Sequence, residues 1–168
     1  MSCMKRVAGI TALVVCLAAS LFAAPAAPPV LKIPGKPDQP VAPESLLGRD
    51  QTDVRLEDTQ GSVTIYHGRP LLQVLEKAGL DVKTMGGQRE VAAGVVVATG
   101  RDGYAVVFSV GELTAGRANP KVFLVSDEDG EPLPDDRGPV RLIVYGDKAR
   151  SAYALATVEL RFLANNKR

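Results

Sequence analysis

The chain has few residues that ligate transition metals or act as strong nucleophiles. Its only cysteines, Cys3 and Cys16, lie in an apolar N-terminal segment, and His67 is its only histidine. If that segment is removed on export, the mature protein has no thiol, which excludes disulfide bonds, cysteine nucleophiles and cysteine-ligated metals. A single histidine also excludes a multi-histidine metal site within one chain. We therefore predict no catalytic residue and no metal ligand.

The chain also lacks an excess of either charge. Removing Lys5 and Arg6 with the N-terminal segment leaves 18 of the 20 basic residues against 19 acidic ones. Because the remaining Lys and Arg residues are not clustered, we expect no nucleic-acid partner. A mature chain of about 142 residues suits one domain, and without disulfides its apolar core alone must stabilise it.

Residues 1–26 have the pattern of a secretory signal peptide. A lysine–arginine pair precedes the predominantly apolar run Val7–Phe22, and Ala24-Pro25-Ala26 supplies an A-x-A cleavage motif. Two alternatives stay open, namely a membrane anchor formed by the apolar run and lipid attachment at Cys16. Cleavage is the favoured interpretation, and it predicts a periplasmic or secreted protein without a membrane span.

Seven prolines lie between residues 24 and 43. Such spacing disfavours helices and regular β-ladders, so residues 27–44 are expected to form a semi-extended linker. The alternative is that Val30–Ile33 acts as a strand that docks on a partner. A single globular domain is then expected over residues 45–168.

The pattern of residues 45–168 predicts a strand-rich fold. Alternating apolar residues predict strands around residues 54–57, 62–66, 95–97, 104–108, 121–126, 140–145 and 157–163. One amphipathic helix is predicted over 70–78, since Pro70 suits a first turn and Gly79 a C-terminal cap. Ser109-x-x-Glu112 predicts a second short helix over 110–114. The fold class is therefore α+β, with a strand-rich mixed sheet and one or two short helices.

Three motifs suggest a calcium, phosphate or catalytic site, but none of them matches the pattern that such a site requires. The acidic run Asp127–Glu131 does not match a calcium loop, because its glycine comes too early and Pro132 follows, so we predict an exposed hairpin turn. The glycines of residues 94–103 bracket a strand and do not form a phosphate-binding turn before a helix. No nucleophile-elbow serine is available to His67, for which we predict a surface or packing role.

Four short motifs occur in order within residues 54–163. They are Tyr66-His67-Gly68-Arg69-Pro70-Leu71, Asp102-Gly103-Tyr104, Asp129-Gly130-Glu131-Pro132-Leu133-Pro134 and Gly138-Pro139-Val140-Arg141-Leu142. In these motifs the chain resembles the sulfite-oxidase-type oxidoreductase molybdopterin-binding domain family. The resemblance implies the α+β fold of that family and molybdopterin as its cofactor.

The chain departs from this family at its functional positions. The family's enzymes ligate molybdenum through a cysteine upstream of the first motif, and residues 27–65 contain none. Oxygen ligands from Asp58 or Ser62 would be the substitutes. Arg137 stands near the place of the family's phosphate-binding histidine, and a lysine–tryptophan pair near the C-terminus is missing. We therefore expect no cofactor, with molybdopterin as the alternative that the resemblance implies.

Arg141, Tyr104 and Arg101 are the candidate ligand-binding residues, in a cleft expected near all three. Arg141 would hold a phosphate or carboxylate bidentately, or else form a strand-end salt bridge. Tyr104 would contact the ligand or pack against the domain. We expect an exported, non-catalytic module that binds a small anionic ligand or a protein partner. The alternatives are a molybdopterin-dependent oxidoreductase with unusual metal ligation, and an accessory protein that docks on another exported enzyme through the proline-rich arm.

Overall fold

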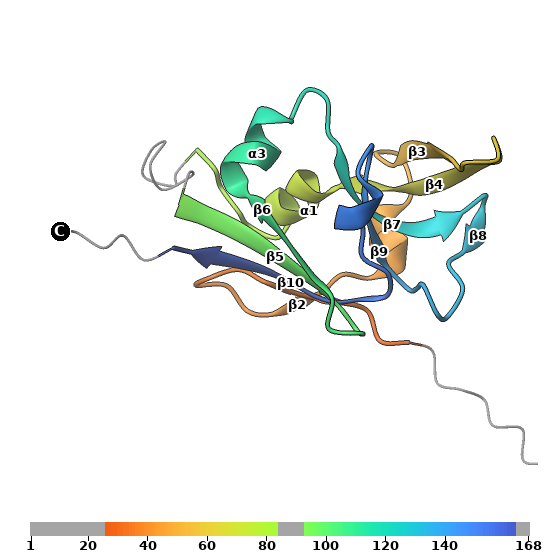
Figure 1. Ribbon diagram of the computed structural model, residues 1–168. Helices are drawn as coiled ribbons and strands as arrows, with labels where there is room; N and C mark the ends of the chain where they lie inside the picture. Colours follow the sequence, from red (N-terminus) through yellow and green to blue (C-terminus); the bar gives the residue numbers. More distant parts are fainter. Residues whose placement is uncertain (1–25, 84–92, 164–168) are drawn as a thin grey trace, which may run out of the picture.

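The computed structural model describes residues 26–83 and 93–163, so the predicted signal peptide and most of the loop at 81–90 lie outside the described residues (Figure 1). The strands are β1 (Val30–Lys32), β2 (Gln39–Pro40), β3 (Thr52–Glu57), β4 (Val63–Pro70), β5 (Gly94–Gly100), β6 (Ala105–Ser109), β7 (Val122–Glu128), β8 (Glu131–Pro132), β9 (Arg141–Val144) and β10 (Leu155–Phe162). The helices are α1 (Leu71–Lys77) and α3 (Val110–Ala115), with 3₁₀ turns η1 (Pro43–Leu46) and η2 (Lys148–Arg150).

These strands form two sheets in the described part of the chain. The first has the order β2-β1-β10-β5-β6, and the second has the order β3-β4-β7-β8, with β9 also paired to β7. The first sheet is mixed, because β1 runs parallel to β10 and the other neighbours are antiparallel. The predicted strand-rich α+β class is therefore confirmed, with the strands divided between two sheets.

Residues 27–44 do not form the expected linker. β1 pairs with β10 of the same domain, and Leu31, Ile33 and Val41 are buried in its core. The prolines are compatible with this arrangement because the three residues of β1 contain none, while Pro40 lies in the edge strand β2. On an edge strand, alternate N–H groups face away from the neighbouring strand, and a proline at such a position removes no ladder hydrogen bond. The prediction of a tether was wrong because proline content alone does not show where the prolines fall relative to a ladder.

In the second sheet, the strands predicted around residues 54–57 and 62–66 form the hairpin of β3 and β4. Next to it, β4 pairs with β7, and the register shifts between His67 and Gly68. At Gly68 the two strands come so close that an added Cβ would lie 2.1 Å from the Leu124 carbonyl oxygen and 2.6 Å from the Val125 Cα. Glycine is therefore required at this position by the close approach of the neighbouring backbone.

Both predicted helices form, and their caps explain their bounds. The backbone N–H of Leu80 donates to the Leu75 carbonyl at 2.9 Å, and that of Gly79 donates to Glu76 at 3.0 Å. With Gly79 at φ +102°, this is the Schellman ending that the sequence predicted for α1. At the start of α3, the Ser109 hydroxyl accepts the Glu112 N–H at 2.9 Å, as expected for a capping box.

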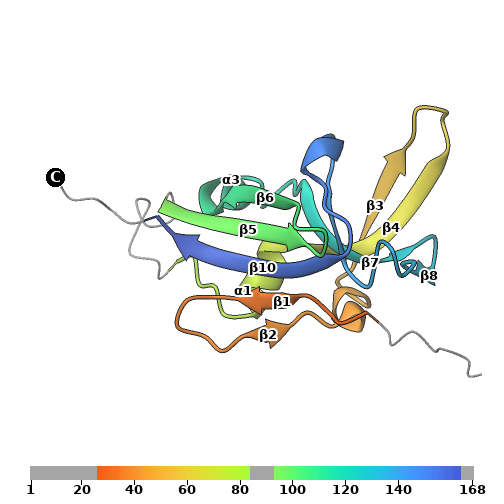
Figure 2. The same ribbon diagram turned by 60° about the horizontal axis from the view of Figure 1, so that its bottom comes forward.

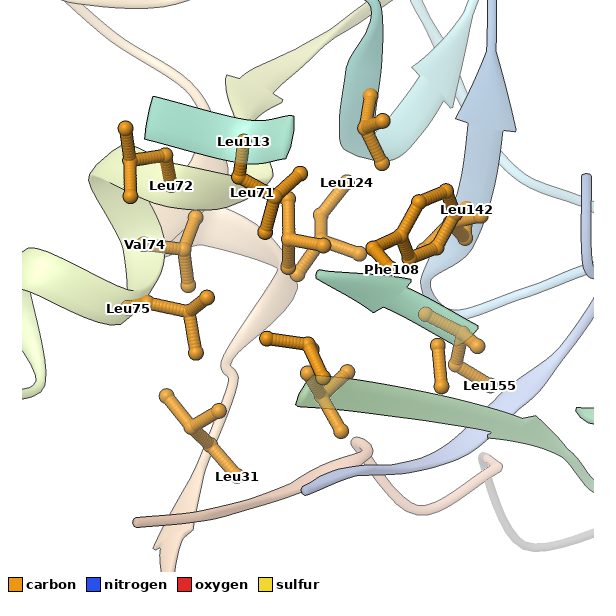
Figure 3. Close-up of a cluster of buried hydrophobic side chains, with 14 of the residues drawn as sticks. Leu31, Leu71, Leu72, Val74, Leu75, Phe108, Leu113, Leu124, Leu142 and Leu155 are labelled. Atoms are coloured by element: carbon orange, nitrogen blue, oxygen red, sulfur yellow. The ribbon is translucent and has the colours of Figure 1, made fainter. Parts of the chain in front are cut away.

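Two apolar clusters hold these elements together. The larger lies between the helices and the sheets (Figure 3), and its fully buried members include Leu71, Leu75, Phe108, Leu124, Leu142 and Leu155. The smaller cluster lies on the second sheet and consists of Val54, Tyr66, Phe123, Val125, Leu133 and Ile143. No helix within residues 26–83 and 93–163 is long and apolar enough to cross a membrane.

Candidate functional site

A cleft of about 780 Å³ lies between the β3–β4 hairpin and the chain that leads from β9 to β10. Figure 2 shows both segments projecting from the same side of the molecule. The hairpin contributes Arg55, Glu57 and Tyr66 to the lining, and the opposite wall contributes residues from Arg137 to Tyr153. The volume of the cleft falls in the range of small-molecule binding sites, roughly 300–1,000 Å³.

Arg141 lies at the cleft and is only 7% exposed. Its Nη1 donates a hydrogen bond to the Tyr66 hydroxyl at 2.9 Å. Its guanidinium carbon lies 5.1 Å from the centre of the Tyr66 ring and 4.1 Å from that of Tyr153. These distances allow cation–π attraction to both rings. The two tyrosines thus hold the arginine in place without neutralising its charge.

The charge of Arg141 has no counter-ion among the described residues. None of the ion pairs found there includes Arg141, and its buried Nε has no hydrogen-bond partner. The strand-end salt bridge considered for this residue is therefore not formed. Because an unpaired buried charge is costly, the arrangement is suited to an anion that enters from the cleft.

The β9 register explains why Arg141 faces this way. The side chains of successive strand residues point to opposite faces of the sheet. The side chain of Arg141 therefore lies on the same face as Ile143 and on the opposite face from Leu142. Ile143 belongs to the small cluster that contains Tyr66, while Leu142 belongs to the large core. The pairing of β9 with β7, and of β7 with β4, places Arg141 beside Tyr66, although the two are 75 residues apart.

Other charged side chains of both signs line the cleft. Arg137 is paired with Glu128, with its Nη1 2.8 Å from Oε2. Arg55 and Lys148 also contribute to the lining, and neither forms an ion pair in the part of the chain that the structure describes. The proposed counterpart of the family's phosphate-binding histidine, Arg137, is thus at the site, but its charge is already matched.

The alternative oxygen ligands are not arranged for a metal. The Asp58 carboxylate accepts the backbone N–H groups of Gln60 at 2.8 Å and Ser62 at 2.9 Å, so it closes the β3–β4 turn. No group of three or more His, Cys, Asp and Glu side chains within residues 26–83 and 93–163 is placed to hold a metal ion. Asp58 lines the cleft beside a second acidic residue, Glu57, and several cations.

Tyr104 and Arg101 do not line this cleft. The Tyr104 hydroxyl donates to the Ala149 carbonyl in η2, and Nη2 of Arg101 donates to the Gly138 carbonyl. Both residues lie in the β5–β6 turn and hold chain segments that lead to the cleft walls. Neither residue therefore lines the cleft with Arg141, and a direct contact of either residue with a ligand remains a prediction.

Sequence reasoning did not identify the three tyrosines as cleft residues. Tyr66, Tyr145 and Tyr153 all line the cleft, and the last two are 54% and 49% exposed. Exposed aromatic residues in loops near a buried arginine would have been a signal for them, because binding sites commonly carry such rings on loops. The proximity of Tyr66 to Tyr153, however, depends on strand pairings that local sequence does not reveal.

His67 and the acidic turn have structural contacts outside the cleft. Nδ1 of His67 lies 2.5 Å from Oδ1 of Asp127, which also accepts the Gly130 N–H at 2.9 Å. Asp129 accepts the Ile65 N–H at 2.8 Å. These contacts join the β7–β8 turn to β4, in keeping with a packing role for His67 and a hairpin turn in the acidic run. Asp127, however, is buried in β7, so the run is not exposed throughout as predicted.

Arg150 holds η2, and with it one wall of the cleft. Its Nη1 lies 3.0 Å from Oε1 of Glu112 on α3, and its guanidinium carbon lies 4.4 Å from the centre of the Phe108 ring. The hydrogen bond to Glu112 raises the pKa of Arg150. Lys148 and Ser151, on either side of this contact, line the cleft.

The comparisons with known proteins identify a family. The model of the oxidoreductase molybdopterin binding domain matches residues 44–160, well over half of the chain. The curated proteins give no match. The unpaired guanidinium of Arg141 fits an anionic group such as the phosphate of the family's cofactor. The metal fits less well, because the matched region contains no cysteine. The chain belongs to the oxidoreductase molybdopterin-binding domain family.

Proposed function

We propose that this protein is an exported, non-catalytic member of its family that binds a small anionic ligand in the cleft. The observation that carries the proposal is Arg141, a nearly buried guanidinium that faces the cleft and has no counter-ion among the described residues. An anion bound there would supply the missing charge. Charge-assisted hydrogen bonds of this kind are stronger than neutral ones, especially at a site with little water.

The lack of a cysteine in the domain supports the non-catalytic part of the proposal. The family's enzymes depend on a metal-ligating thiolate, and no cysteine is present after Cys16. Export is supported by the charged n-region, apolar run and A-x-A motif of residues 1–26. A protein with these properties would bind its ligand outside the cytoplasm without converting it.

The second candidate is a molybdopterin-dependent oxidoreductase with unusual metal ligation, which family membership favours. Metal analysis and pterin fluorescence of protein purified from its natively exported form separate the two candidates. We expect neither molybdenum nor pterin. Stoichiometric molybdenum would contradict the binding-module proposal and favour the oxidoreductase.

The third candidate, an accessory protein docked through its proline-rich arm, has less support. Val30–Lys32 of that arm lies between β2 and β10 in the first sheet, so this strand is already paired on both sides. A protein partner would therefore have to bind elsewhere.

The binding proposal is testable with the protein's own tyrosines. The chain has no tryptophan, and three of its four tyrosines line the cleft, so tyrosine fluorescence reports on this site. We expect inorganic phosphate or acetate, added at constant ionic strength, to change this fluorescence saturably. Arg141→Met should abolish the change, while Arg161→Met, at an exposed arginine on β10 away from the cleft, should preserve it. Equal responses in both variants would refute the role of Arg141.

A further inference from the structure

The cleft offers more than a place for a bare anion. Two of the largest exposed apolar side chains of the described residues, Tyr145 and Tyr153, both lie on its wall, and Leu56 and Val144 add aliphatic lining. Half-exposed aromatic rings that gather at one cleft are unusual on a free surface and typical of recognition sites, where they stack on a ligand. A small inorganic anion would leave these rings unused.

The charges of the lining favour a ligand with one negative charge. Glu128 matches Arg137, and the cations Arg55 and Lys148 are accompanied in the lining by the acids Glu57 and Asp58. The four cleft cations and these three acids leave one net positive charge, and Arg141 is the most buried of the four. A planar guanidinium pairs with carboxylates and with phosphates, and of these two groups the carboxylate carries the single negative charge that the lining favours.

We propose that the ligand class of this cleft is an aromatic monocarboxylate, with its carboxylate at Arg141 and its ring against Tyr153 and Tyr145. This inference rests on the proposed function, because it names the anion that the site binds. Tyr153 has a double role in it. Its ring lies 4.1 Å from the guanidinium carbon of Arg141, and about half of its surface remains available to a ligand.

The test compares the binding of four probes by isothermal titration calorimetry, namely 2-naphthoate, acetate, 2-naphthamide and 2-naphthyl phosphate. If the ring stacks on tyrosine and the carboxylate pairs with Arg141, 2-naphthoate should bind at least about tenfold more tightly than acetate. It should also bind more tightly than the neutral amide. Tighter binding of 2-naphthyl phosphate than of 2-naphthoate would overturn the monocarboxylate assignment.

Substitutions of the tyrosines then test whether the aromatic ring of the ligand stacks on them. Tyr153→Leu should weaken 2-naphthoate binding at least about fivefold while changing acetate binding less than about twofold, because the ring contact is lost while the hydrogen bond to the Tyr66 hydroxyl still holds Arg141. Tyr153→Phe should restore binding because it keeps the ring. The matched control is Phe162→Leu, which removes a ring of similar exposure on β10 outside the cleft and should have no effect. If Tyr153→Leu does not fold, Tyr145→Leu provides the same test.

The outcomes distinguish this inference from the function on which it rests. If acetate and phosphate bind through Arg141 but 2-naphthoate binds no better, the anion site stands and the aromatic ligand class is refuted. If no probe binds, both proposals fail. If Tyr153→Leu weakens all probes equally, Tyr153 only holds Arg141 in place, and the stacking assignment is refuted.

Discussion

Two arginines of the second sheet, Arg69 on β4 and Arg141 on β9, are almost equally buried, at 5% and 7% exposure. Arg69 lies in a region of backbone acceptors. Its Nε donates to the Ser45 carbonyl at 3.0 Å and its Nη2 to the Leu47 carbonyl at 3.1 Å, while its Nη1 lies 3.2 Å from the Asp50 carboxylate. Arg141 has one hydrogen bond, to the Tyr66 hydroxyl, and two aromatic rings.

This difference in contacts distinguishes an arginine that stabilises the fold from one that is available to bind a ligand. Arg69 joins β4 to η1 and the loop that follows it. Its Nη1 has no hydrogen bond, but the Asp50 carboxylate lies 3.2 Å away and compensates the charge. Arg141 is held in position by tyrosines that leave its charge uncompensated and facing a cleft. Burial alone therefore does not distinguish the two roles, whereas the nature of the contacts does. Removing Arg69 should cost stability, and removing Arg141 should cost binding.

The largest effect is expected from Gly68→Ala, which disturbs the strand that carries both Arg69 and Tyr66. The added methyl would lie 2.1 Å from the Leu124 carbonyl oxygen, so β4 and β7 would have to separate. We expect a loss of about 4 kcal/mol or more in the free energy of unfolding, measured by urea denaturation. As a control, Gly111→Ala in α3 has space for its methyl and should be neutral or slightly stabilising. A small loss in Gly68→Ala would contradict the close approach of the strands.

The next largest effect is expected from Arg69→Met, which preserves apolar volume and removes the charge. The carbonyl groups of Ser45 and Leu47 would lose their donors, and the loop would lose its anchor. We expect a loss of about 3 kcal/mol in unfolding free energy. Anion binding, measured by tyrosine fluorescence, should be unchanged in the folded protein. A loss below about 1 kcal/mol would show that Arg69 is not the structural member of the pair.

Arg141→Met should have a much smaller effect on stability. The variant loses cation–π contacts with Tyr66 and Tyr153, but it also removes an uncompensated buried charge. We expect the unfolding free energy to stay within about 1 kcal/mol of the wild type. Saturating phosphate should raise the Tm of the wild type and not that of the variant. A large destabilisation would instead make Arg141 a structural residue like Arg69.

The smallest effect is expected at an exposed pair, Glu159 and Arg161 on β10, which extends the comparison to the surface. The hydrogen bond from Arg161 lowers the pKa of the Glu159 carboxyl. A lowered pKa in the folded state stabilises the protein at neutral pH, and this contribution disappears as the pH falls through that lowered value. Glu159→Gln should therefore be slightly less stable than the wild type at pH 7 and equal to it in strong acid. A difference that persists in acid would exclude the ionic contribution. Solvent screening keeps the effect small.

Local sequence patterns predicted much of the fold. The β3–β4 and β5–β6 hairpins, α1 with its glycine cap and α3 with its capping box depend on residues that are close in sequence. The segment at 27–44 was mispredicted because its stability comes from pairing with β10, more than a hundred residues later. Non-local pairing of this kind leaves little trace in a proline-rich segment.

The candidate site was predictable only in part. The resemblance to the family drew attention to Arg141, which does face the cleft. It also pointed to Tyr104, and the cleft expected nearby added Arg101. The fold uses these two residues to hold η2 and the Gly138 carbonyl. Tyr66 belonged to a recognised motif, yet its hydroxyl bond to Arg141 could not be inferred, because it depends on the order of three strands.

The sequence by itself determined the chemical limits of this protein. It leaves no thiol after Cys16 and only one histidine, and it places its helices and turns through local spacing and capping residues. Only the tertiary structure decided which of the buried arginines would be compensated. Charge compensation depends on contacts between strands that are distant in the chain, so Arg69 meets carbonyl groups and a carboxylate while Arg141 meets two tyrosines and an open cleft.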